Sequence, residues 1–457
     1  MLVRIAVLLL AAIAWGQRLA PPADATRRVA QVFGRFDNTA VPGCAVGVGL
    51  RGDTVLTAAY GMADLEHDVP NKPDSVFEAG SVSKQFTAMA VLLLAQQGRL
   101  SLEDPVRKYI PELPEYEAPI TIRHLLNHTS GLRDWGSLED IAGWPRTTRA
   151  YTHAHVLEIL SRQRSLNYLP GAEYSYTNSG YNLAAILVGR VSGKSFADFT
   201  RDAIFQPLGM TSTAWRDDFR RVVKNRSIAY MQSGAVFRQL MPFENVHGNG
   251  GLLTTVGDLL KWNRNFTTAK VGGWELVAQQ QRQARLNDGR TISYALGLFI
   301  MEYRGLREVS HSGTTAGYNA WLGRYPDQDL SVAVLCNSSL ANGTELGHSV
   351  ADIYLGDAAK GPPPTRPAQP APGPAWQPTP EQLASFAGDY TSDEIETTLR
   401  VAVENGRLVI HRRPDDMIAL TPSGADAFSS SIGMVRFVDG QMSVHQGRVW
   451  DLRFRRQ

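Results

Sequence analysis

Ser81 and Lys84, three positions apart, are the first residues in the chain whose types and spacing could do chemistry. They open an apolar stretch that predicts a helix, and positions i and i+3 of a helix share one face, so hydroxyl and ammonium could meet. A serine hydroxyl is a weak nucleophile until a neighbour accepts its proton, which a partly desolvated lysine can do. The helix N-terminus would add amide donors where an oxyanion forms. Serine is also a favoured N-cap, so this motif alone does not establish catalysis.

A second motif, Tyr176 and Asn178, precedes another predicted helix. The phenol could carry a proton between groups, and the amide could hydrogen-bond both the lysine and a substrate.

A third motif, His311, Gly313 and Thr314, lies at the opening of a predicted strand. Gly313 would let a substrate lie against the strand edge. The amide of Thr314 could join that of Ser81 as the second oxyanion donor.

In this order and at these separations, the three motifs resemble the serine β-lactamase and penicillin-binding-protein family. The similarity is to its class C-like branch, which includes D,D-carboxypeptidases, D-aminopeptidases and related esterases. Segments 121–132, 206–210 and 250–255 also look like that branch, and the resemblance covers about residues 30–350.

The resemblance implies an acyl-enzyme formed on Ser81, with Lys84 and Tyr176 sharing the acid and base work. Asn178, His311 and Gly313 would line the substrate, and no metal or organic cofactor is implied. An alternative is a receptor for penicillin or cell-wall fragments that is acylated at Ser81 and does not turn over.

His311 departs from the β-lactamases of this branch, which usually carry lysine there to attract a carboxylate. Histidine, with an ordinary pKa of about 6.5, offers at best a partial charge at neutral pH. The departure favours an esterase or peptide hydrolase over a dedicated β-lactamase. The substrate would be a small molecule or a peptide, namely an ester, a D-amino-acid amide or peptide, or a β-lactam, and cell-wall material is one source.

The elements that must position these residues alternate between strand and helix patterns. Strands are predicted over 45–50, 55–60, 319–325 and 330–336, and helices over 81–97 and 181–191. Strands at both ends with helices between them indicate an α+β fold, in which one antiparallel sheet carries a helical insert. This matches the β-lactamase-like fold that the resemblance implies.

The 457-residue chain is long enough for two domains. Nine of the 20 residues in 361–380 are proline, which predicts an extended linker between a hydrolase domain, 25–360, and a small domain, 381–457. In the small domain, strand patterns flank Asn405-Gly406 and Asp439-Gly440, as in hairpins. We expect a small antiparallel sheet or barrel there, of unassigned role.

Cys44 and Cys336 are the two cysteines of the chain. The implied fold makes their strands antiparallel neighbours, so a disulfide is possible in an oxidising compartment, and two buried free thiols are equally compatible with the sequence.

Residues 1–16 have a short basic head and an apolar run, which predicts a signal peptide and an exported protein, periplasmic or extracellular. No later stretch is apolar enough to span a membrane.

A net charge of +2 without a basic run argues against nucleic acid as a partner. His-Glu-x-x-His and Gly-x-Ser-x-Gly are both missing, which disfavours zinc hydrolases and α/β-hydrolases. The sequence predicts no oligomeric state.

Overall fold

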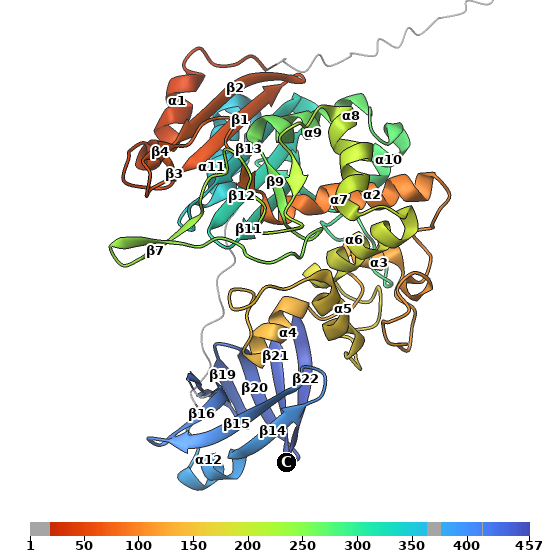
Figure 1. Cartoon of the computed structure of the whole chain (residues 1–457), viewed down its shortest axis with the longest axis vertical. Coiled ribbons are helices and arrows are strands. Elements are labelled where there is room, and N and C mark those ends of the chain that lie inside the picture. The colour runs from red at the N-terminus through yellow and green to blue at the C-terminus, as the bar shows by residue number, and fades with distance from the viewer. Residues whose placement is uncertain (1–18, 363–375, 414) are drawn as a thin grey trace, which may run out of the picture.

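The computed structural model describes residues 19–362, 376–413 and 415–457, which form a large unit and a small one (Figure 1). The expected signal peptide, 1–16, lies outside the described residues. So does most of the expected linker, 361–380. Among the described residues, no helix has the length and apolar character needed to cross a membrane.

A six-stranded antiparallel sheet forms the centre of the large unit, with β1 and β13 paired along their whole length. Its strands, in spatial order, are β10 (Phe299–Tyr303), β11 (Leu306–Thr315), β12 (Tyr318–Tyr325), β13 (Leu330–Cys336), β1 (Cys44–Leu50) and β2 (Asp53–Tyr60). The predicted sheet built from both ends of the unit is therefore confirmed.

Strand β1 shows how the sequence sorts the two faces of this sheet. Val46 and Val48 point into an apolar cluster with α1 (Ala25–Val32) and α11 (Gly343–Leu355). On the other face, a Cβ added to Gly47 would lie 3.1 Å from Leu260 of α9 (Val256–Thr268). Small residues on that face therefore let α9 pack closely against the sheet.

Between β2 and β10 the chain forms a largely helical region and several short strands (Figure 1). The helices are α2 (Lys84–Gln96), α3 (Ile122–Asn127), α4 (Trp135–Ala142), α5 (His153–Ser161), α6 (Asn178–Ser192), α7 (Phe196–Thr200), α8 (Gln206–Leu208), α9 and α10 (Gly273–Gln280). The short strands are β3 (Met62–Asp64), β4 (Val69–Pro70), β5 (Phe77–Glu78), β6 (Ala214–Trp215), β7 (Tyr230–Ser233), β8 (Val236–Gln239) and β9 (Leu252–Thr254). Helix α2 is apolar and buried along most of its length, which places it in the core beside the sheet.

The small unit is a nine-stranded antiparallel sheet that curls into a nearly closed barrel (Figure 1), preceded by α12 (Pro380–Phe386). Its strands are β14 (Gly388–Ser392), β15 (Thr397–Glu404), β16 (Arg407–Arg413), β17 (Asp416–Ala419), β18 (Thr421–Gly424), β19 (Ala427–Ser430), β20 (Gly433–Val438), β21 (Gln441–Gln446) and β22 (Val449–Arg456). Both predicted hairpin turns form: φ is +47° at Asn405 and +75° at Gly406, and +49° at Asp439 and +74° at Gly440. Left-handed backbone at both positions suits a two-residue hairpin.

Arg133 fastens the small unit to the helical region. Its guanidinium is almost fully buried and donates to the Glu394 carboxylate at 2.8 Å and to the Trp450 carbonyl at 3.2 Å. A buried, charge-assisted contact of this kind fixes orientation as well as distance. The small unit therefore sits directly on the helical region.

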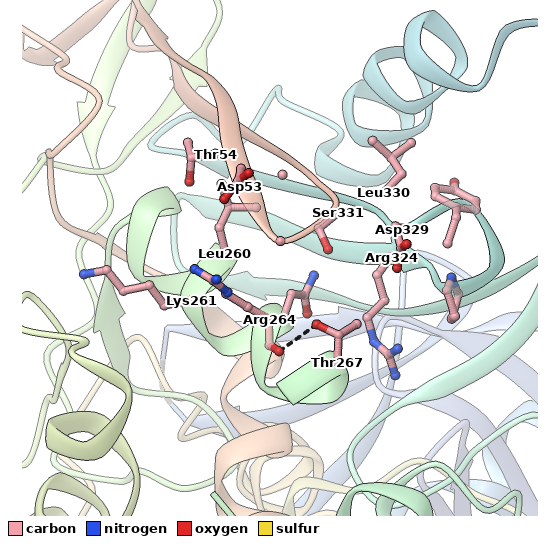
Figure 2. Close-up of a pocket in the computed structure, with 15 residues that line it drawn as sticks. Asp53, Thr54, Leu260, Lys261, Arg264, Thr267, Arg324, Asp329, Leu330 and Ser331 are labelled. Carbon is pink, nitrogen blue, oxygen red and sulfur yellow. Dashed lines mark hydrogen bonds between the residues drawn. The ribbon is translucent and has the colours of Figure 1, made fainter. Parts of the chain in front are cut away.

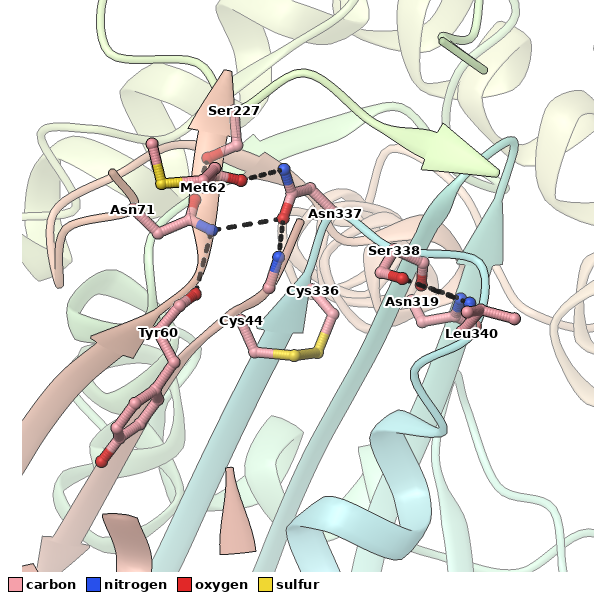
Figure 3. The surroundings of a disulfide bond; sticks show 11 residues. Cys44, Tyr60, Met62, Asn71, Ser227, Asn319, Cys336, Asn337, Ser338 and Leu340 are labelled. Atoms are coloured by element: carbon pink, nitrogen blue, oxygen red, sulfur yellow. Dashed lines mark hydrogen bonds between the residues drawn. A yellow bond between two sulfur atoms is a disulfide. The ribbon is translucent and has the colours of Figure 1, made fainter. Parts of the chain in front are cut away.

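Cys44 and Cys336 form a disulfide between the directly opposed ends of β1 and β13 (Figure 3). Beside it, the Asn337 amide accepts a hydrogen bond from the Gly43 N–H at 2.8 Å and donates to the Met62 carbonyl at 2.9 Å. Of the two states that the sequence left open, the structure thus holds the bridged one.

Candidate active site

Ser81 lies in a 3₁₀ turn, Gly80–Ser83, and α2 begins only at Lys84, so the prediction of a helix from Ser81 is wrong in this detail. A 3₁₀ turn has about three residues per turn, which stacks positions i and i+3 above each other. Lys84 Nζ accordingly lies 3.0 Å from Ser81 Oγ.

Lys84 is held by two further oxygens. Its Nζ donates to Asn178 Oδ1 at 3.0 Å and to the Asn249 carbonyl at 2.7 Å. Both oxygens can only accept, so a neutral amine would keep its lone pair for the Ser81 proton. Burial holds the pKa of Lys84 well below its usual range, Arg448 and Arg146 lower it further, and Asp134 opposes them. The geometry thus suits a lysine that acts as a base.

Tyr176 lies over this lysine, with 4.8 Å between Lys84 Nζ and the ring centroid. Burial raises the pKa of the Tyr176 phenol, while the neighbouring Ser81 hydroxyl opposes the rise. The phenol therefore stays protonated near neutral pH, where it can relay or donate a proton.

Asn178 is the first residue of α6, which begins three residues before the predicted start at 181. The side chain of Thr177 caps the helix, and the Asp134 carboxylate accepts from the Asn178 N–H at 2.7 Å. These contacts point the Asn178 amide at Lys84.

His311 lies within β11, which begins at Leu306, so the expectation that His311 opens the strand is wrong. Its Nδ1 is 2.6 Å from the Ser312 carbonyl, which must accept, and its Nε2 is 3.0 Å from the Tyr294 hydroxyl. The carbonyl can only accept, so the Nδ1 nitrogen carries a proton. Burial, reinforced by the charge of Lys84, lowers the pKa of His311 to about 3. His311 is therefore uncharged at neutral pH.

Two glycines bring β11 against the Ser81 turn. A Cβ on Gly313 would lie 2.0 Å from the Ala79 carbonyl oxygen, and a Cβ on Gly80, whose φ is +50°, would lie 2.7 Å from Thr314 N. This close approach sets the amides of Ser81 and Thr314 beside the nucleophile, where they could receive an oxyanion.

A cavity of about 400 Å³ lies over these residues. Its lining includes Ser81, Tyr176, Asn178, His311, Gly313 and Thr314. Lys84 is fully buried beneath them. The structure therefore brings every residue predicted for the site together at one place.

A separate cavity of about 260 Å³ lies where α9 meets the β1–β2 turn (Figure 2). Asp53, Lys261 and Arg264 are among its lining residues. None of the predicted site residues lines it.

The sequence prediction missed several residues of the site. His128, in left-handed backbone after α3, packs its ring 4.2 Å from that of Tyr176, and its Nδ1 accepts from the Thr177 N–H at 3.2 Å. Burial lowers the pKa of His128 well below its usual value, with the charge of Lys84 as the second cause. His128 lies in segment 121–132, where the resemblance was a usable signal, whereas no motif pointed to Tyr294.

Away from the cavity, Asp64, Glu66 and His67 bring three potential metal-ligand atoms within 4.8 Å of one another. Glu66 and His67 are exposed, and His67 Nδ1 lies 2.8 Å from the Asp64 carboxylate. An ordinary surface ion pair accounts for this cluster.

Comparison with curated proteins finds relatives at moderate identity. Penicillin-binding protein 4* of Bacillus subtilis is 30% identical over 309 residues, which are 63% of this chain and 66% of that protein. D-aminopeptidase of Brucella canis is 28% identical over 338 residues, which are 73% of this chain and 62% of that protein. The chain spans 60–66% of the length of the curated relatives that it matches.

Among solved structures, an octameric penicillin-binding protein homologue from Pyrococcus abyssi has a TM-score of 0.63 and 22% identity. The match covers 94% of this chain and 97% of that one. A D-amino acid amidase from Ochrobactrum anthropi has a TM-score of 0.60 and 22% identity, covering 72% of this chain and 97% of that one. At this identity the likeness concerns the fold.

Residues 28–355 match the β-lactamase family, described as Beta-lactamase. That span contains the Ser81 turn, the start of α6 and strand β11, and it ends where α11 ends. The chain belongs to the β-lactamase family.

Proposed function

We propose that the protein is a serine hydrolase that forms an acyl-enzyme on Ser81, acting on an ester or on a D-amino-acid amide or peptide. The observation that carries the proposal is the placement of Lys84 Nζ, 3.0 Å from Ser81 Oγ and held by two carbonyl oxygens. The named relatives, a D-aminopeptidase and a D-amino acid amidase among them, support this substrate range.

In the first half of the reaction, Ser81 Oγ attacks the substrate carbonyl carbon while its proton passes to Lys84. The amides of Ser81 and Thr314 receive the oxyanion. When the tetrahedral intermediate collapses, Tyr176 gives a proton to the leaving nitrogen or oxygen and takes one back from Lys84. The products are the leaving group and the Ser81 ester.

In the second half, water attacks the Ser81 ester, and Tyr176 with Lys84 takes up its proton. The tetrahedral intermediate releases the acid, and the proton returns to Ser81 Oγ. Asn178 keeps Lys84 oriented through both halves.

The neutral state of His311 argues against a dedicated β-lactamase. A lysine at this position would offer a permanent cation, whereas His311 offers only hydrogen bonding and shape. Strand β11 therefore offers no charge to a substrate carboxylate at this position.

The test is pre-steady-state hydrolysis of p-nitrophenyl acetate, with mass spectrometry of Ser81. We expect a burst equal to the enzyme concentration, followed by continuing turnover, and neither in Ser81→Ala. A burst without turnover would instead identify a receptor. A panel of D-amino-acid amides, esters and β-lactams then ranks the acyl groups by their rate of Ser81 acylation.

We also propose that the protein is exported to the periplasm or beyond the cell. The basic and apolar pattern of residues 1–16 supports this, and so does the Cys44–Cys336 disulfide, since such bonds persist in oxidising compartments. Cell fractionation with N-terminal sequencing of the product tests it, and an uncleaved cytosolic chain would overturn it.

A further inference from the structure

Two arginines line the cavity above Ser81, and their charges are balanced differently. Arg146 Nε donates to Glu244 at 2.9 Å, and the Glu244 side chain is only 3% exposed. Arg448 has Asp134 as its nearest carboxylate, with 4.0 Å between Nη1 and Oδ2. Within the described ranges, the Arg448 guanidinium makes no hydrogen bond. Its donors are therefore available to a ligand, whereas Arg146 is already paired.

Asp134 makes no hydrogen bond with Arg448, and both of its oxygens already accept at helix starts. Its Oδ2 accepts from the Asn178 N–H at 2.7 Å, and its Oδ1 accepts from the Ser137 N–H at 3.1 Å.

Arg448 comes from the small unit, in the turn between β21 and β22. Its backbone carbonyl accepts from the Asp134 N–H and from Asn167 Nδ2, each at 3.2 Å, so the hydrolase unit anchors the turn. The side chain is 44% exposed and sets its Cζ 5.0 Å from the centre of the Tyr176 ring. The backbone is thus fixed while the guanidinium reaches the open side of the cavity.

This inference rests on the proposed function, in which Tyr176 protonates the leaving atom. The leaving portion of a substrate must then lie beside Tyr176, and Arg448 lies over that ring. His311 carries no charge, so β11 offers no cation to this part of the cavity.

We propose that Arg448 binds a carboxylate on the leaving portion of the substrate, which makes the small unit part of the active site. The planar guanidinium can grip a carboxylate through two parallel hydrogen bonds. The charge that lysine supplies from the strand in related β-lactamases would then come from the β21–β22 turn of a separate unit.

Two esters with the same acyl group and different leaving groups test this: 3-acetyloxybenzoate, which carries the carboxylate, and the neutral 3-acetyloxybenzamide. The measured quantity is the ratio of their kcat/KM values. Because both esters need the same base, any effect of Arg448 on Lys84 cancels in the ratio. We expect Arg448→Gln to lower the ratio by about 10- to 100-fold, mainly through the KM of the carboxylate ester. Arg448→Lys should keep part of the preference for the carboxylate ester, because lysine keeps the positive charge and lacks the planar group that donates two parallel hydrogen bonds.

The matched control is Arg436→Gln, which removes an exposed arginine of β20 and should leave the ratio unchanged. A ratio that Arg448→Gln does not change, or an equal loss on both esters, would overturn this inference while leaving the hydrolase proposal intact. Failure of the hydrolase proposal looks different, because the wild-type protein would then show no Ser81-dependent hydrolysis of either ester. Unfolding midpoints of all variants show whether a loss reflects misfolding.

Discussion

At the scale of single residues, Lys84 decides what the site can do. A solvated lysine is a cation at neutral pH and cannot accept a proton. Here burial and two arginines of the cavity make the charge of the side chain costly, while two carbonyl oxygens hold its nitrogen in place. Because its nitrogen lies 3.0 Å from Ser81 Oγ, the neutral amine can accept the serine proton.

The electrostatic link between Arg448 and Lys84 predicts a shift in the pH profile. Arg448 helps to lower the pKa of Lys84, so Arg448→Gln should raise that pKa. Only neutral Lys84 acts as the base, so the acid limb of kcat/KM should move to higher pH. The profile is measured with the neutral 3-acetyloxybenzamide between pH 5 and 9. An acid limb that stays in place, or moves to lower pH, would contradict the prediction.

The residues that sequence reasoning could find are those whose chemistry shows in a short motif. Ser81 and Lys84 are three positions apart, so one turn of backbone brings them together. His128 packs on Tyr176 and Tyr294 hydrogen-bonds His311, and both contacts depend on how the folded chain brings their segments together. Arg448 is a plain arginine in a hairpin turn, and only the docking of the two units places it in the cavity.

At the scale of elements, the site depends on the close approach of β11 to the Ser81 turn. Gly80 and Gly313 face each other across this contact, where backbone atoms leave no room for a Cβ. The two amide donors keep their positions only while this contact is kept.

Gly313→Ala should therefore reduce ester hydrolysis strongly. The new Cβ would lie 2.0 Å from the Ala79 carbonyl oxygen, so the strand must shift away. A displacement near 1 Å costs about 100-fold in rate, and we expect kcat/KM for p-nitrophenyl acetate to fall by at least that factor. The control is Gly257→Ala in α9, where the new Cβ meets nothing closer than 3.9 Å. Comparable activity in the two variants would refute the argument.

Elements set by local chemistry were predictable, and those set by distant contacts were not. The Asn405-Gly406 and Asp439-Gly440 hairpins need only residues that tolerate positive φ. The start of α6 at Asn178 depends on Asp134, 44 residues away, and the 3₁₀ turn at Ser81 depends on the approach of β11. Only the Thr177 cap of α6 is local, whereas the contacts with Asp134 and with β11 come from distant parts of the chain.

At the scale of the whole molecule, the disulfide joins β1 and β13, the strands of the central sheet that come first and last along the chain. It closes a sequence separation of 292 residues, and a bridge across a long loop restricts the unfolded chain most. Replacing both Cys44 and Cys336 by alanine should lower the free energy of unfolding by about 2–4 kcal/mol. Urea denaturation measures this loss. Dithiothreitol should lower the wild-type midpoint and leave that of the double variant unchanged.

Buried histidines should make the fold sensitive to mild acid. His128, His247 and His311 all have their pKa lowered in the folded protein, mainly by burial. Below pH 6.5 the unfolded chain binds protons at these positions and the folded protein does not. The free energy of unfolding therefore decreases as the pH is lowered, by about 1.4 kcal/mol per pH unit for each histidine.

Urea midpoints at pH 5.0 and 7.0 test this pH dependence. The difference between them should shrink in His247→Asn and persist in a variant of the exposed His445. Equal stability at the two pH values would show that these histidines do not control the acid response.

The pairing of β1 with β13 also has a consequence for biosynthesis. At about 5–20 residues per second, a ribosome needs about 15–60 s to make the 292 residues that separate the two cysteines. Throughout that interval the apolar strand β1 lacks β13, so one edge of its backbone stays unpaired in the growing polypeptide. We therefore expect newly made chains to depend on chaperones until β13 emerges, and to aggregate when translation stalls before it.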